Sequence, residues 1–396
     1  MSQPAVAATP PRLQREATPP RMLLMAATVA GLLAAYPIAL LAVSAFLLIN
    51  LSASTSRPVR LVLAMMLALS LSLMIGTRTL TADGSNDIDG YYLVYGSLAE
   101  GDLSALLHFG GGFEVALPLL MLAWAVVLPP LSVNGLMFCL ALTGSLLTLV
   151  WVEKTFYSGG NRLRPALMGV CLLLLNLYFA TQLVRQFLAL VMLLYAFTAV
   201  GRGRQAFFLA IATTFHLTAL PFFALYLLAR RGWAGWLFII VLALLLRVYF
   251  WQLLVTLDIL PVAAVDKLLY YVDNIEESSA SDIGSLRMIF LLAAISIAAL
   301  IAYRFRPPKA VRPWLAIPWI TVIVHYLLLP IPLASLRTTL MIHSVAPGLI
   351  AYMMLSGRTG LLFTVTLHVL LIYKVAAFAL AEPLRSTVAM VSGFFL

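Results

Sequence analysis

The chain has 396 residues, of which 63% are hydrophobic and only 10% are charged, with a net charge of +10. A soluble domain of this composition could not cover its surface with polar groups, so a soluble globular protein is excluded. The positive charge does not indicate nucleic-acid binding, because an excess of Lys and Arg is typical of short cytoplasmic loops beside anionic lipid. We therefore expect an all-α, polytopic integral membrane protein.

The amino terminus and the apolar runs predict one membrane domain behind a short tail. Residues 1–21 are polar and rich in Pro and Ala, which predicts disorder. The apolar run that follows has no cleavage site near its start, so we expect a retained span instead of a signal peptide. Residues 22–396 then form a single polytopic domain with about twelve transmembrane helices. These are expected near residues 22–50, 59–76, 114–131, 133–152, 165–182, 183–201, 206–229, 233–256, 286–303, 314–331, 337–356 and 360–380.

The connections between these runs suggest an orientation in the membrane. Two of them, residues 77–113 and 257–285, are long and rich in Gly, Ser, Asp and Tyr. Four short connections are basic, and positive loops tend to stay in the cytoplasm. They are residues 56–60, 229–233, 304–313 and 356–360. Alternation across twelve spans then places both long loops on the extracytoplasmic side. The basic segments 153–165 and 201–205 disagree with this topology, so either the charge rule is overridden there or one segment is re-entrant.

The first long loop carries a possible sugar-binding surface. Asp87, Tyr91 and Tyr95 follow one another at intervals of four residues, so in a helix they lie on one face. A carboxylate beside two aromatic rings suits a sugar, because rings stack on its apolar faces and carboxylates bind its hydroxyls. An interfacial helix with its tyrosines at headgroup level explains the same pattern equally well. The residues alone leave both interpretations open.

Ionisable side chains also lie within the apolar runs, where they usually face the bundle interior or a water-filled cavity. They are Arg185, His216, Arg247, His325, Arg337, His343, His368 and Lys374. No pair of histidines has metal-ligand spacing, so a zinc site is not expected. No cofactor is expected either. Buried arginines with almost no buried acids indicate an anion handled in the membrane, and a lipid-linked phosphate or diphosphate is the natural candidate. The simpler alternatives are that Arg185 snorkels to the headgroups and that His216 is a packing residue.

The order of several short motifs resembles the EpsG family, the Wzy-like polymerases of bacterial exopolysaccharides. An arginine precedes an acidic loop with Asp-x3-Tyr-x3-Tyr, and a glutamate then opens an apolar run. Tyr-Phe-x5-Arg-Gln-x2-Ala follows, and Phe-His-x2-Ala comes about thirty residues later. The matching residues are Arg78, Asp87, Tyr91, Tyr95, Glu114, Tyr178, Phe179, Arg185, Gln186, Ala189, Phe215, His216 and Ala219, with looser matches at Arg287 and Arg337.

The resemblance implies polymerisation of undecaprenyl-diphosphate-linked oligosaccharide repeat units, in the inner membrane of a bacterium and at its extracytoplasmic face. Such an enzyme stabilises a departing diphosphate and deprotonates an acceptor hydroxyl. Asp87, Glu114 or His216 is expected to act in catalysis, and Arg185 to anchor the diphosphate. Substrate binding is expected from Arg78, Tyr91, Tyr95, Arg185, Gln186, Arg287 and Arg337. The expected partners are the lipid-linked oligosaccharide and membrane lipids, with a flippase and a chain-length regulator of the same pathway, and no nucleic acid.

Two other functions fit the residues. A multi-span glycosyltransferase that uses polyprenyl-monophosphate sugars also carries acidic residues in an outer loop, but usually directly after its first span. A flippase for lipid-linked glycans also needs a cationic cavity, but typically shows internal repeats, and none is convincing here.

Overall fold

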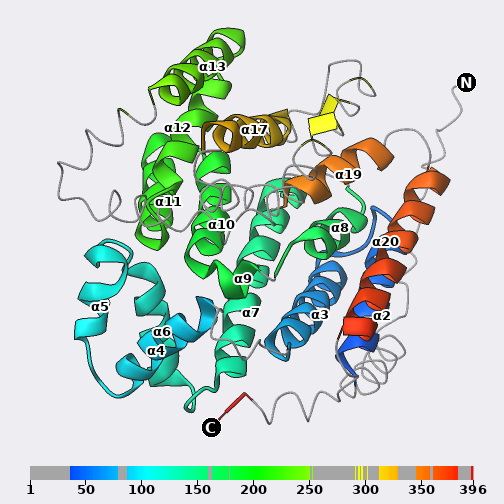
Figure 1. Cartoon of the computed structure of the whole chain (residues 1–396). Helices are drawn as coiled ribbons and strands as arrows, with labels where there is room; N and C mark the ends of the chain where they lie inside the picture. Colours follow the sequence, from blue (N-terminus) through cyan, green and yellow to red (C-terminus); the bar gives the residue numbers. More distant parts are fainter. Residues whose placement is uncertain are drawn as a thin grey trace, which may run out of the picture.

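A computed structural model of the chain describes residues 36–78, 87–158, 163–177, 179–249, 312–328, 345–356, 360–381 and 394–395, with a few single positions between 252 and 301. Within these ranges the protein is helical, apart from one bridge between Leu131 and Phe395 (Figure 1). The helices are α2 (Pro37–Asn50), α3 (Arg57–Gly76), α4 (Asp87–Ala99), α5 (Ser104–His108), η1 (Phe109–Gly112), α6 (Ala116–Val127), α7 (Val133–Val152), η2 (Glu153–Tyr157), α8 (Ala166–Leu174), α9 (Phe179–Gln182), α10 (Val184–Thr198), α11 (Arg202–Phe215), α12 (Ala219–Ala229), α13 (Trp233–Val248), η4 (Arg312–Leu315), α17 (Ala316–Leu328), α19 (Ala346–Ser356) and α20 (Gly360–Ala381).

Two of the described helices are long and apolar enough to cross a membrane, Arg57–Gly76 and Val133–Tyr157. They pack antiparallel, because Gly76 at the end of α3 lies against Phe138 near the start of α7, and Arg60 near the start of α3 meets Glu153 after α7. We call the end with Arg60 and Glu153 the basic end. The end where α3 stops and α7 begins, and where residues 77–132 connect them, is the loop end.

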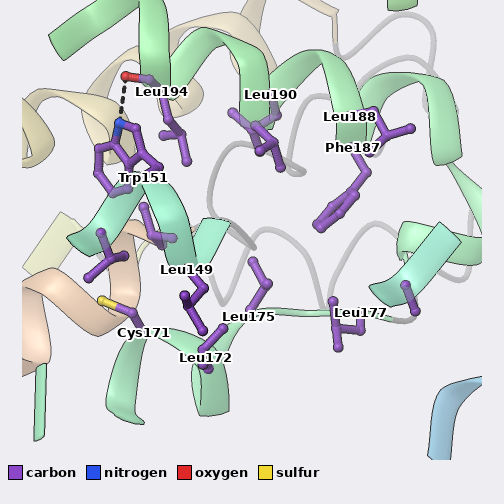
Figure 2. Packing of buried hydrophobic residues seen from close by; sticks show 14 of the residues in the cluster. Leu149, Trp151, Cys171, Leu172, Leu175, Leu177, Phe187, Leu188, Leu190 and Leu194 are labelled. Atoms are coloured by element: carbon purple, nitrogen blue, oxygen red, sulfur yellow. Dashed lines mark hydrogen bonds between the residues drawn. The ribbon is translucent and has the colours of Figure 1, made fainter. Parts of the chain in front are cut away.

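The core lies where α7, α8 and α10 meet. Leucine side chains from all three helices interdigitate there, and Trp151 of α7 donates a 2.8 Å hydrogen bond from Nε1 to the carbonyl oxygen of Leu194 (Figure 2). Phe187 packs so closely on Gly144 that a Cβ there would lie 2.2 Å from the ring. These contacts show that α10 runs parallel to α7 and begins near its mid-length.

The predicted span 206–229 is wrong, because it consists of two helices. α11 ends at Phe215, His216 leaves the helical conformation with φ −161° and ψ 129°, and α12 starts at Ala219. α11 packs antiparallel along α10, since Phe208 stacks on Tyr195 at 5.2 Å. α12 then returns, since Tyr226 contacts Phe197 near the end of α10. The chain therefore enters and leaves from the same end, as a re-entrant segment does, which agrees with the second of the two alternatives left open by the sequence.

The predicted span 114–131 is shorter than expected. Its helix, α6, has 12 residues and is therefore about 18 Å long, well below the thickness of a bilayer core. Leu131, which follows α6, is held at the loop end by the hydroxyl groups of Tyr92 and Tyr95. The first predicted span is described from Tyr36, and Pro37 lies in the first turn of α2, where proline is tolerated, so it produces no kink within this helix.

These two corrections remove the conflict between charge and topology. A short α6 and a doubled-back α11–α12 each change the count of crossings, so basic segments that alternation had separated now lie together. Arg57, Glu153 with Lys154, Arg202 and Arg230 all lie at the basic end, since their helices start or stop there. The loop 257–285 and most of the spans predicted at 286–303 and 337–356 lie outside the described residues.

Candidate functional site

The site lies where two interrupted helices face each other. Arg185 is the second residue of α10, directly after the short helix α9, and His216 lies in the break between α11 and α12. Glu114 precedes α6 and comes between them. Because Phe187 packs at mid-length of α7, the site lies deep in the bundle, away from both ends of α7. Interrupted helices at the middle of a membrane commonly bind ions and charged substrates.

Glu114 connects the other two residues. Its Oε2 accepts a hydrogen bond from Nη1 of Arg185 in a close ion pair, and its Oε1 lies 3.4 Å from the backbone nitrogen of Leu217 and 3.7 Å from Nδ1 of His216. The carboxyl side chain is 7% exposed and the arginine side chain 17%. Arg185 therefore does not snorkel to the headgroups, because its guanidinium pairs with a buried acid.

The hydrogen bonds of His216 determine which ring nitrogen carries a proton. The backbone N–H of Thr218 donates to Nδ1 at 3.2 Å, and the Thr218 hydroxyl oxygen lies 2.9 Å from the same atom. A backbone N–H can only donate, so Nδ1 is an acceptor and a neutral ring carries its proton on Nε2. In this state the ring donates through Nε2 and accepts at Nδ1.

Both helix starts at the site favour negative charge. The first N–H groups of α10 and α12 have no partners within their own helices, and each helix dipole adds partial positive charge at that end. The amide before α12 is directed at Glu114, as shown by the Leu217 hydrogen bond. The two helix starts around Glu114 thus favour an anion at this position, even without the charge of Arg185.

Two aromatic rings border this ion pair. The guanidinium carbon of Arg185 lies 5.0 Å from the centre of the Phe109 ring, and Phe109 in turn lies 6.1 Å from the ring of Tyr91. Within the part of the chain that the structure describes, Nε of Arg185 and Oε1 of Gln186 are buried without a hydrogen bond. Buried polar groups are rarely left so, and a ligand with an acceptor for Nε and a donor for Oε1 would satisfy both atoms.

The structure brings together some of the predicted site residues. Glu114, Arg185 and His216 are in contact, and Tyr91 interacts with Arg185 directly and also lies beside Phe109. α4 is a helix, as the spacing of Asp87, Tyr91 and Tyr95 required. Asp87 is exposed at its start, and its backbone N–H donates to Gln182 at 3.0 Å.

The other predicted residues are more distant or outside the described ranges. The hydroxyl of Tyr95 accepts from the N–H of Leu131 at 3.1 Å, so this buried side chain ties α4 to the segment before α7. Arg78 follows α3 at the loop end with a buried guanidinium. Arg287 and Arg337 lie outside the described residues.

Sequence reasoning missed Phe109 and the backbone amides of Leu217 and Thr218. The only signal for Phe109 was its place directly before three glycines, and the amides carry no signal without the helix break. No cluster of three or more His, Cys, Asp or Glu side chains that could hold a metal ion occurs within the described ranges.

A second arginine–glutamate cluster lies at the basic end. Arg60 makes a forked contact with both carboxylate oxygens of Glu153 at 2.8–3.1 Å, and its guanidinium lies 4.0 Å from the centre of the Tyr157 ring. Arg57 adds a hydrogen bond to Oε1 at 3.1 Å, although its side chain is 72% exposed. This cluster joins the start of α3 to the end of α7.

Comparison with known proteins identifies the family. The model of the EpsG family matches residues 61–386, which is most of the chain. The match includes Glu114, Arg185 and Glu153, but it begins after Arg57 and Arg60. No curated protein matches the chain, and neither does any solved structure. The apolar helices agree with a protein embedded in a membrane. Because the matched region covers far more than half of the sequence, the chain belongs to the EpsG family, whose members are exopolysaccharide-related membrane proteins of the polymerase type.

Proposed function

We propose that the protein polymerises oligosaccharide repeat units carried on a polyprenyl diphosphate, at the extracytoplasmic face of the bacterial cytoplasmic membrane. The observation that carries this proposal is Arg185, a deeply placed guanidinium with one edge on Glu114 and a buried Nε without a hydrogen bond. Family membership supports a glycosyltransferase of the polymerase type.

The reaction requires two things of the protein: fixed positive charge that stabilises the leaving group, and one base. The acceptor hydroxyl oxygen bonds to the anomeric carbon of the donor, the bond from that carbon to the phosphate oxygen breaks, and the diphosphate leaves with the bonding electrons. The hydroxyl proton passes to a base. Arg185 and the amides at the start of α12 stabilise the negative charge that develops on the leaving group, because they are already oriented before the reaction.

Glu114 is the best placed of the three candidate bases. His216 accepts from Thr218 at Nδ1 and carries its proton on Nε2, so it is suited to donate to a phosphate or sugar oxygen. Asp87 is exposed at the start of α4. Glu114 is a carboxylate in contact with both Arg185 and the α12 amides, so it is placed to take up the hydroxyl proton beside a diphosphate bound at the free Nε edge of the arginine.

The proposal is tested with purified protein and a lipid-linked repeat unit as the only substrate. We expect wild-type protein to lengthen the lipid-linked glycan, and Arg185→Lys to lose at least about 100-fold in rate while remaining folded, because an ammonium cannot reproduce a two-point grip. Arg202→Lys, at an exposed position of the basic end, is the matched control. Elongation at the wild-type rate by Arg185→Lys would refute the anchor role. A protein that only translocates lipid-linked units would not lengthen the glycan.

A further inference from the structure

The segment between α4 and α6 contributes two contacts to the same guanidinium. Phe109 places its ring 5.0 Å from the guanidinium carbon of Arg185, and Glu114, five residues later, pairs with Nη1. The guanidinium carbon lies over the ring, whereas the carboxylate contacts Nη1. Two contacts from one short segment restrict the positions that the guanidinium can take.

A glycine makes this double contact possible. Gly112 has φ +79°, a conformation that residues with a side chain rarely adopt, and an added Cβ would lie 2.9 Å from the carbonyl oxygen of Leu107. The turn at Gly112 separates Phe109 from Glu114 and directs both towards α10. Other residues could not make this turn without strain.

The aromatic contact has a consequence for the free edge of the arginine. Cation–π attraction holds the guanidinium over the ring and so limits the directions in which its N–H groups can point. Nη1 is used by Glu114, and Nε is the buried donor without a hydrogen bond in the described structure. Tyr91 of α4 is 7% exposed, lies 6.1 Å from the Phe109 ring and also interacts with Arg185 itself.

We propose that Phe109 is a positioning residue, which orients Arg185 so that Nε meets a phosphoryl oxygen of the donor. This rests on the proposed function, since the oxygen is that of the lipid diphosphate. Phe109 itself need not touch the reacting atoms. Its contribution is to remove orientations of the guanidinium that do not bind, which raises affinity for the donor.

The test compares Phe109→Leu with Phe109→Tyr. Leucine keeps an apolar side chain but removes the ring face, whereas tyrosine keeps it. We expect Phe109→Leu to bind inorganic pyrophosphate about three- to thirty-fold more weakly and to raise KM for the lipid-diphosphate donor by a similar factor, with kcat changed less. Phe109→Tyr should restore both values. The control is Phe113→Leu, because Phe113 lies in the same segment and is 70% exposed.

The outcomes separate this inference from the proposed function. Unchanged pyrophosphate affinity and KM in Phe109→Leu, together with weakened binding in Arg185→Lys, would overturn the positioning role and leave the diphosphate site intact. Unchanged pyrophosphate affinity in Arg185→Lys would overturn the diphosphate site itself. A fall in thermal stability of Phe109→Leu with unchanged KM would show a packing role and would also overturn the inference.

Discussion

Two arginine–glutamate pairs lie at different depths along α7, and they are built differently. Arg60 and Glu153, at the basic end, share a fork of hydrogen bonds that is completed by Arg57 and the Tyr157 ring. Arg185 and Glu114, near mid-length, share one contact, and Nε of the arginine remains without a hydrogen bond among the described residues. The first pair is saturated, whereas the second is left open on one edge.

The two pairs also differ in the helices that carry them. Arg60 and Glu153 join two continuous helices, and their side chains are 9% and 10% exposed. Arg185 and Glu114 meet at the breaks of two helix pairs, next to His216. An open pair at a helix break keeps donors available, which is what binding an anion requires.

The largest expected effect concerns which of the two regions faces the outside. The described part of the loop end carries Asp89, Glu100 and Asp102, whereas the basic end carries the arginines, so positive loops should be cytoplasmic. In a background without Cys139 and Cys171, a cysteine at Glu100 should react completely with a membrane-impermeant thiol reagent from outside. A cysteine at Arg202 should react only after the inner face is opened.

Two other labelling patterns would be informative. Reversed labelling would invert the orientation and place the candidate site in the wrong half of the membrane. Labelling of both positions from one side would show that α3 and α7 do not separate the two ends, and the comparison would fail.

The next effect separates stability from activity. Glu153→Gln leaves Arg60 buried beside a neutral side chain, so we expect a loss of roughly 3 kcal/mol in the free energy of unfolding, the low end of the range for breaking a buried pair. Glu114→Gln should lose less stability, because Arg185 is more exposed and already lacks one partner, but it should abolish polymer formation. Thermal unfolding of the purified protein and glycan elongation measure the two quantities.

A double substitution sharpens this prediction. Arg60→Met with Glu153→Leu replaces a saturated pair by apolar groups of similar size, which is often neutral or stabilising, so folding and activity should largely recover. Arg185→Met with Glu114→Leu should fold equally well and remain inactive. Equal losses of stability and activity at both pairs would contradict the distinction between them.

Much of the fold follows from apolar runs, because helices are the simplest way to satisfy backbone groups in lipid. The runs at 59–76 and 133–152 predicted α3 and α7 almost to the residue. Hydropathy could not show that 114–131 and 206–229 fail to cross, since a short or broken helix has the same composition as a spanning one. Pro221, in the first turn of α12, and Pro129, after α6, were the local signals that a helix begins or ends there.

The candidate site was predictable in its charges but not in its connections. Arg185 was recognised because ionised groups are costly at membrane depth, and the same reasoning applies to Glu114 at the start of an apolar run. Their pairing depends on a turn at Gly112 and on the start of α10, which no spacing in the sequence encodes. Tyr95 lies on the predicted face, and its hydroxyl accepts from the Leu131 N–H, a contact that the spacing of residues in the sequence did not predict.

The smallest effect concerns the role of His216 within the open pair. Its Nδ1 accepts from the Thr218 N–H, so we expect it to act as a hydrogen-bond donor through Nε2. Glutamine places an N–H donor close to the position of Nε2, whereas alanine provides none. His216→Ala should therefore lose about ten- to a hundred-fold in kcat/KM, the range for a hydrogen bond to a charged group, and His216→Gln should retain several-fold more activity than His216→Ala.

Three results would distinguish the possible roles of this histidine. If it acts as the base, both variants fail alike, since neither amide nor methyl accepts a proton, and Glu114 loses that assignment. If both variants polymerise normally and differ only in thermal stability, His216 packs the break between α11 and α12. His216 would then have a structural role, as Arg60 and Glu153 have at the basic end, and the open pair would consist of Arg185 and Glu114 alone.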